Sequence, residues 1–248
     1  MKQDKKLILG MALLFLITFV SFGTIVVTEK LAPFFTDKIK TKFETYIEKN
    51  YKDDKNYLTI GKITYKNQQY KAKISNKKNK NWYFYITYQK KKIKDTYKED
   101  YLEGKTLLTS IERKIEKKVK DELNQKVTIT FPLTLNKYTN QIKENLISNN
   151  LKEIKTYDIT LTITTPTLTT ENINKELEKR IQELYQIDIY PNHYTIKINS
   201  KDEKLTITNL TEKTMKKEYR TQIINDIINN TNSNIIKENN ITYNYVYK

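Results

Sequence analysis

The longest apolar stretch of the chain lies near its N-terminus. It runs from Leu7 to Val27, 21 residues without a charged side chain, which is long enough to cross the hydrocarbon core of a bilayer as a helix. Lys2, Lys5 and Lys6 precede it, as in the positive region of a signal sequence or signal anchor. The pattern predicts a cytoplasmic tail and transmembrane helix in residues 1–28, with the C-terminal domains extracytoplasmic.

Signal cleavage is the alternative to an uncleaved anchor. Ser21 and Gly23 are small residues two positions apart, which a signal peptidase accepts. Thr24 to Val27 continue the apolar run past that point, and this continuation favours the uncleaved anchor. The following flank, from Lys30 to Lys42, is also basic, so the comparison of positive charge on the two sides is weaker than usual.

Beyond this stretch, the spacing of apolar residues changes from a helical to a strand period. Apolar positions three and four residues apart predict an amphipathic helix over residues 29–51. Alternating positions then predict half-buried strands at 57–65, 70–75 and 82–88. The links between these strands are short and polar, which is typical of hairpin turns. An antiparallel meander is therefore expected.

The rest of the chain mixes further helices and strands. The apolar stripe over residues 105–123 predicts a helix, and alternation over 127–135 predicts a strand in which Pro132 favours an edge position. The other predicted elements are helices at 137–147, 171–186 (N-cap Thr170) and 212–228, and strands at 157–164, 194–198, 204–208 and 241–247. This order predicts an α+β fold with antiparallel sheets. One or two small domains are expected, divided as 29–125 and 126–248.

Composition narrows the classes of function. The chain has 248 residues, 38% of them hydrophobic, which suffices for a folded core. Its net charge of +16 comes almost entirely from lysine, and a basic surface attracts polyanions. Lys, Asn, Ile and Tyr are also the residues of AT-rich codons, so genome composition contributes to this charge. The absence of cysteine excludes disulfides and thiolate zinc sites.

The sequence shows no motif for a metal, a nucleotide or a serine nucleophile. His193 is the only histidine, and no G-x-S-x-G motif surrounds any serine. Gly10, Gly23, Gly61 and Gly104 are too scattered for a phosphate-binding loop. We therefore expect no cofactor, no metal and no catalytic residues.

One acidic cluster could in principle support acid and base chemistry. Asp95, Glu99, Asp100 and Glu103 lie close together in the segment KDTYKEDYLEG. Negative charge also stabilises the N-terminus of a helix, and a helix is predicted immediately afterwards. A junction between a strand and a helix therefore explains these residues without catalysis.

The most suggestive segment for binding runs from Lys55 to Lys94. It holds twelve lysines, many tyrosines and no acidic residue. Interleaved lysines and aromatic rings suit single-stranded nucleic acid, anionic wall polymers or lipid headgroups, although an amphipathic sheet with solvated lysines also explains the pattern. The residues predicted to bind are Lys71, Lys73, Lys77, Lys78, Lys80, Trp82 and Tyr83.

Part of this segment also carries a family resemblance. Residues 70–118 include YKAKISNKKNKNWYFYITY followed by KIKDTYKEDYLEGKTLLTSIERKIEKK. This stretch resembles small membrane-anchored proteins of low-GC Gram-positive bacteria known as YfjL-like proteins. The resemblance implies a single N-terminal anchor, a small α+β extracytoplasmic domain and no established activity. It transfers no functional residues.

Together these features predict a non-enzymatic, single-pass protein of the cell membrane. We expect it to bind a protein partner or an anionic envelope component such as a wall polymer, and a membrane tether argues against nucleic acid as the partner. A scaffold subunit of a secretion or conjugation channel is an alternative, because such subunits also pair one helix with a compact α+β domain. A membrane-tethered hydrolase that uses the acidic cluster is another.

Overall fold

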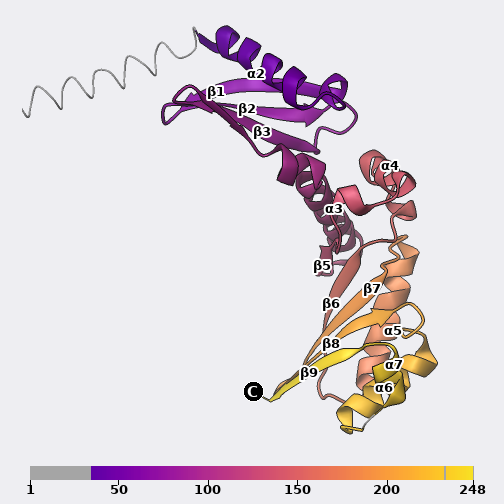
Figure 1. Ribbon diagram of the computed structural model, residues 1–248. Helices are drawn as coiled ribbons and strands as arrows, with labels where there is room; N and C mark the ends of the chain where they lie inside the picture. The colour runs from indigo at the N-terminus through magenta and orange to yellow at the C-terminus, as the bar shows by residue number, and fades with distance from the viewer. Residues whose placement is uncertain (1–34, 232, 248) are drawn as a thin grey trace, which may run out of the picture. The chain divides into compact units, whose positions relative to one another are not determined.

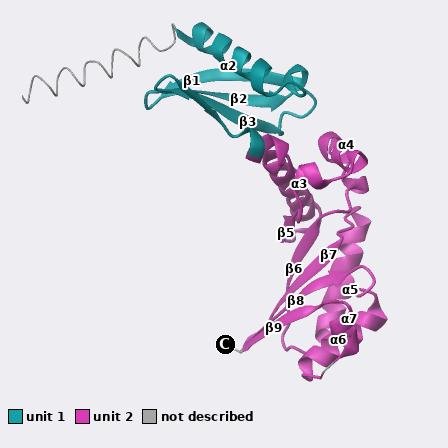
Figure 2. Cartoon of the chain, in the orientation of Figure 1, with its two compact units in different colours: residues 1–98 teal, residues 99–248 magenta. Residues whose placement is uncertain are grey.

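Two sheets with associated helices form the α+β fold of this chain. The computed structural model describes residues 35–231 and 233–247. They separate into two compact units, divided between Lys98 and Glu99 (Figure 2). Unit 1 contains a four-stranded sheet and unit 2 a five-stranded sheet, so the predicted α+β class is confirmed. Residue 125, the division expected from the sequence, follows the end of helix α3 (Lys105–Leu123) within unit 2.

The predicted membrane segment, residues 7–27, lies outside the described residues. Within the described ranges, no helix is both long enough and apolar enough to cross a membrane. The amphipathic helix expected over residues 29–51 can be compared from residue 35 onward. There it is observed as α2, which covers Thr36–Asn50.

In unit 1, helix α2 lies along one face of an antiparallel meander (Figure 1). The elements after α2 are η2 (Lys55–Tyr57), β1 (Leu58–Lys66), β2 (Gln69–Asn76), β3 (Tyr83–Gln89) and β4 (Lys92–Asp95). The strands lie in the order β1-β2-β3-β4 in the sheet. Ile39, Phe43 and Ile47 recur every four residues on α2, and none is more than 6% exposed. The strands contribute Ala72, Ile74, Phe84 and Ile86 to this core, each at most 1% exposed.

Strand β4 was not predicted from the sequence, because its signals are weak. It has only four residues, and two of them are lysines. The turn before it consists of Lys90 and Lys91, both with positive φ, as a two-residue hairpin of type I′ requires. Lysine is an unusual residue for this turn, in which Asn-Gly and Gly-Gly are the common signals.

Unit 2 combines helices with a five-stranded sheet. The short helix η3 (Tyr97–Leu102) spans the division between the two units. The elements that follow it are α3, β5 (Val127–Thr130), η4 (Leu135–Lys137), α4 (Asn140–Ser148), η5 (Leu151–Glu153), β6 (Asp158–Thr164), α5 (Thr170–Gln186), β7 (His193–Asn199), β8 (Glu203–Thr211), α6 (Lys217–Ile228), α7 (Asn234–Glu238) and β9 (Thr242–Tyr247). The strand order in the sheet is β5-β6-β7-β8-β9. Helix α3 has the predicted bounds. The side chain that caps α5 is Thr169, one residue before the predicted Thr170.

The second sheet is not purely antiparallel, and this corrects the sequence-based prediction. Strands β6 and β7 pair in parallel, with Asp158 opposite His193 at one end of the pair and Thr164 opposite Asn199 at the other. Parallel neighbours need a long crossover connection, and helix α5 lies in the segment that joins these two strands. The other three pairs in this sheet are antiparallel.

Candidate binding surface

The sheet of unit 1 has a basic and aromatic face on the side away from its buried core. Successive side chains of a strand point to opposite faces, so Lys71 and Lys73 face away from the buried residues between and beside them. In the pairing of β2 with β3, Lys73 is opposite Tyr85, and Ser75 is opposite Tyr83. In the pairing of β3 with β4, Thr87 lies between Lys71 and Lys94. We call Lys71, Lys73, Tyr83, Tyr85 and Lys94 the open face.

Two lysines of the open face lie above tyrosine rings. The Nζ atom of Lys71 is 3.8 Å from the ring centroid of Tyr85, and the Nζ atom of Lys73 is 3.7 Å from that of Tyr83. Both distances are within the range of a cation–π interaction, which extends to about 6 Å. The two rings are themselves in edge contact, with centroids 5.5 Å apart. These contacts therefore hold two ammonium groups and two rings close together, while both lysines stay exposed.

No carboxylate of the sheet lies on the open face. The chain has no acidic residue between Lys55 and Lys94, and the next one, Asp95, is opposite Ile86 in the pairing of β3 with β4. Asp95 therefore shares the buried face with Ile86, where its carboxylate accepts a hydrogen bond of 2.6 Å from the Tyr46 hydroxyl of α2. The positive charge of the open face is thus not offset by a carboxylate from its own strands.

Four of the seven predicted binding residues lie elsewhere, in the connection between β2 and β3. These are Lys77, Lys78, Lys80 and Trp82. The connection is ordered by two buried asparagines, Asn76 and Asn79. Their side-chain oxygens accept hydrogen bonds from the backbone N–H groups of Lys78 (2.8 Å) and Asn81 (2.9 Å), as in Asx turns. The structure therefore divides the predicted set between the connection and the open face.

Of the residues predicted to bind, Lys71, Lys73 and Tyr83 lie on the open face, while its other two members, Tyr85 and Lys94, were not among those predicted. Tyr85 could have been found, because it alternates with the apolar residues of β3 in the same way as Tyr83. Lys94 belongs to β4, which carried too weak a strand signal. At the other end of the strands, the Nζ atom of Lys78 lies 5.3 Å from the ring centroid of Tyr57.

The acidic cluster is used for local contacts. Asp95 accepts the Tyr46 hydroxyl and also the backbone N–H of Tyr97, at 2.9 Å. Glu99 lies 2.7 Å from the ammonium of Lys105, and the hydrogen bond from that ammonium lowers the pKa of Glu99. Within residues 35–231 and 233–247, no group of three or more histidine, aspartate or glutamate residues is arranged to hold a metal ion.

The single histidine pairs with a neighbouring strand. His193 begins β7, and its Nδ1 atom lies 3.0 Å from the Asp158 carboxylate, which begins the parallel strand β6. Asn192 also lies within hydrogen-bonding distance of this ring nitrogen, at 2.9 Å. These contacts join the starts of the two parallel strands.

The fold and the surface define this chain as a two-unit α+β protein with a basic, tyrosine-rich sheet face. Comparisons with protein families, with curated proteins and with solved structures give no match. The resemblance of residues 70–118 to YfjL-like proteins therefore stays a prediction.

Proposed function

We propose that this chain is a non-enzymatic, single-pass membrane protein whose unit 1 binds an anionic polymer of the cell envelope through the open face. The observation that carries the proposal is the ordered pair of lysines above tyrosine rings, Lys71 over Tyr85 and Lys73 over Tyr83. The uncharged stretch from Leu7 to Val27 supports the anchor.

The spacing of the open face suits a polymer better than a single small anion. Lys71 and Lys73 are two residues apart on one strand, so their Cα atoms are about 6.6 Å apart. Lys94 lies two strands away from Lys71, about 9.6 Å across the sheet. A chain with repeated phosphate or carboxylate groups can contact several of these lysines at once, while its neutral parts pack on the rings of Tyr83 and Tyr85. Binding of this kind weakens as salt concentration rises.

Charge reversal on the open face tests this proposal. The double variant K71E/K73E of the full-length chain in detergent should bind long-chain polyphosphate, or a purified anionic wall polymer, about tenfold more weakly or worse, which corresponds to about 1.4 kcal/mol. The measurement is a titration at two salt concentrations. The matched control is K155E/K213E in unit 2, because both of its lysines are exposed and also lie above tyrosine rings, at 5.6 Å.

The control variant should keep most of the affinity, because it removes the same charge from a different surface. Equal weakening by both variants would mean that only net charge matters, and would contradict the role of the open face. Tighter binding of single-stranded nucleic acid than of either envelope probe would also contradict the proposed partner.

A second function, the scaffold subunit of a secretion or conjugation channel, is favoured by the edge strand β9. This strand is the edge of the second sheet in the described part of the chain. Its sequence, TYNYVY, holds no charge and no proline, and its pairing with β8 is regular. Tyr243 and Val246 are 40% and 44% exposed. A strand edge of this kind is suited to pairing with another chain.

The other sheet edges of the described residues carry features that discourage such pairing. Strand β1 has a bulge between Ile60 and Ile63, and β4 carries two lysines. Beside β5, carboxylates of α3 accept the backbone N–H groups: Glu116 accepts that of Ile129 at 3.0 Å, and Glu112 accepts that of Phe131 at 3.1 Å. The contrast with β9 supports pairing of β9 with a second copy.

Sedimentation of the detergent-solubilised full-length chain tests this second function. Wild type should form dimers or larger species as concentration rises, and V246K should shift the equilibrium toward monomer by about tenfold, because a lysine on the edge opposes pairing. T64K on the edge strand β1 is the matched control and should behave as wild type. A wild-type chain that stays monomeric throughout would contradict the scaffold function.

A further inference from the structure

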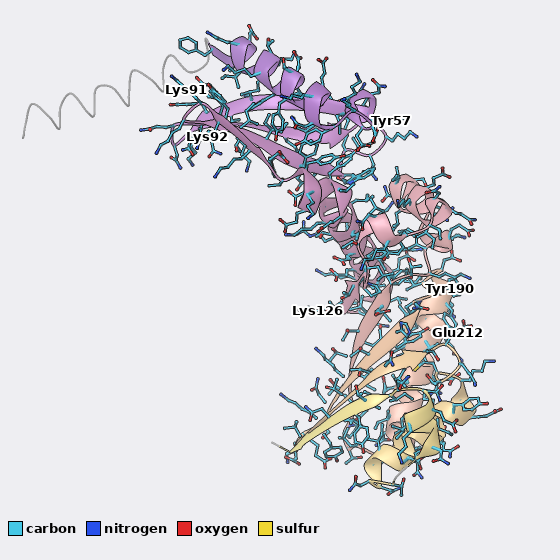
Figure 3. The ribbon with its side chains drawn as sticks, in the orientation of Figure 1. Tyr57, Lys91, Lys92, Lys126, Tyr190 and Glu212 are labelled. Atoms are coloured by element: carbon cyan, nitrogen blue, oxygen red, sulfur yellow. The ribbon has the colours of Figure 1, made fainter. Side chains whose placement is uncertain are left out.

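One end of unit 1 gathers both tight hairpin turns and the start of α2. The β1–β2 turn at Asn67 and Gln68 and the β3–β4 turn at Lys90 and Lys91 lie at the same end of the meander. Phe35 lines one hollow together with residues of both turns. Figure 3 shows Lys91 at this end of the unit and Tyr57 at the opposite end. We call the residues around these two turns and Phe35 the hairpin end.

The hairpin end is rich in exposed and half-exposed aromatic rings. Phe35 is 50% exposed. Beside it, the rings of Tyr65 and Tyr70 have centroids 4.6 Å apart, and those of Tyr70 and Tyr88 are 6.5 Å apart. All four rings line the same hollow. Amphipathic tyrosine rings are enriched at the level of lipid headgroups, where one edge is apolar and the other is hydrated.

Lysines surround these rings. They come from the end of β1, from the β3–β4 turn, from the start of β4 and from the first half of α2. They are Lys38, Lys42, Lys66, Lys90, Lys91 and Lys92, all exposed. A second groove, lined by Lys38, Lys42 and Lys91, adjoins the aromatic hollow because Tyr88 lines both. The ammonium of Lys42 donates a hydrogen bond of 3.2 Å to the Tyr88 hydroxyl.

The charge at this end is strongly positive. The first turn of α2 contributes a single carboxylate, Asp37, against the six lysines. Clusters of about four to eight lysines or arginines next to a membrane anchor are typical of binding to anionic lipids. Rings and lysines together therefore match a surface that has both anionic groups and an apolar layer beneath them.

Chain length places the hairpin end close to the predicted anchor. Val27, the last residue of the uncharged stretch, precedes Phe35 by eight residues. Eight residues span at most about 29 Å when fully extended. If residues 7–27 cross the membrane, Phe35 cannot lie farther than this from the point where the anchor ends.

We propose that the hairpin end of unit 1 rests on the anionic headgroups of the membrane in which the chain is anchored. The inference depends on the anchor that forms part of the proposed function. Lysines in and beside the two turns and on α2 contact lipid phosphates, and the rings of Phe35, Tyr65, Tyr70 and Tyr88 lie at the headgroup level. The connection between β2 and β3 is at the opposite end of strands about 25 Å long, and therefore faces away from the bilayer.

Fluorescence quenching by brominated lipids tests this orientation in the full-length chain. Trp82 is the only tryptophan and lies in the β2–β3 connection, so its emission should stay unquenched in vesicles of brominated phosphatidylcholine and phosphatidylglycerol. A reporter chain carries Q89W together with W82F, which moves the single tryptophan to the exposed last residue of β3. Its emission should fall by about half in the same vesicles, because the hairpin end meets the lipid.

Charge reversal separates specific contact from proximity. In the reporter chain, K90E/K92E should abolish most of the quenching, since it removes two lysines from the hairpin end. The matched control K78E/K80E makes the same change in net charge at the opposite end and should leave the quenching unchanged. Vesicles of brominated phosphatidylcholine alone should also give little quenching, because they have no net negative charge.

The outcomes distinguish failure of this inference from failure of the anchor. A chain that resists alkaline carbonate extraction but shows no quenching of the reporter is anchored without resting on the headgroups, which overturns the inference alone. Release by carbonate overturns the anchor and the inference together. Quenching of Trp82 equal to that of the reporter, or equal effects of the two charge reversals, also overturns the orientation.

Discussion

Replacing Gly104 with alanine should lower the free energy of unfolding of unit 2 by about 3 kcal/mol. Gly104 precedes α3 with a φ of +73°, a conformation that alanine adopts only with strain. An added Cβ would also lie 2.2 Å from the Cβ atom of Leu135, a buried residue. Because the clash involves a Cβ atom, which a side-chain rotation cannot move, the backbone near η4 must shift.

Hydrogen exchange read at α3 and η4, together with urea unfolding followed by circular dichroism, measures this effect. The control is K105A at the next position, which removes an exposed ion pair with Glu99 and should unfold at the same denaturant concentration as wild type, because solvent screens such a pair. A G104A variant as stable as wild type would show that the loop carrying Leu135 can move away at little cost.

The second large effect is expected from R220A, which should destabilise unit 2 by about 3 kcal/mol. Arg220 lies on α6 and is only 3% exposed. Its guanidinium donates to the carboxylate of Glu178, to the side-chain oxygen of Asn174 at 2.8 Å, and to the carbonyl of Met215 at 3.0 Å. Truncation removes all of these donors and leaves a cavity between α5 and α6.

A second arginine of unit 2 provides the control for this variant. Arg180 pairs with Glu183 on the same helix at 3.2 Å, and its side chain is 28% exposed. R180A should therefore cost less than about 1 kcal/mol. Denaturant unfolding of both variants makes the comparison, and similar losses would contradict the importance of the buried network of Arg220.

The pH dependence of the Arg220 effect follows from Glu178. The hydrogen bond from Arg220 lowers the pKa of Glu178 below its usual value. A lowered pKa in the folded state means that the carboxylate stabilises the fold above its unfolded pKa, and that this stability is lost as pH falls through the folded value. The difference between wild type and R220A should therefore be largest near neutral pH and should shrink in acid. A difference independent of pH would show that packing alone explains it.

Local patterns predicted many elements of the fold because they depend only on neighbouring residues. Helix α3 has the expected bounds because Leu107, Ile111, Ile115 and Val119 form a buried stripe on one helix face. Strands β1, β2 and β3 begin and end within about one residue of their predicted positions, since alternation is equally local. The parallel pairing of β6 with β7 was missed, because the alternation of a strand does not reveal the direction of its neighbour.

The candidate site depends on both kinds of information. The sequence by itself determined that lysine and tyrosine alternate with apolar residues in the segments that form β2 and β3, and that no acid interrupts them. Only the tertiary structure decided that Lys71 lies over Tyr85 and Lys73 over Tyr83, and that Asp95 belongs to the opposite face. These placements depend on the register between strands, in which a shift of one residue moves every side chain to the other face. Register arises from pairing between distant segments, so the order of residues along a single strand does not reveal it.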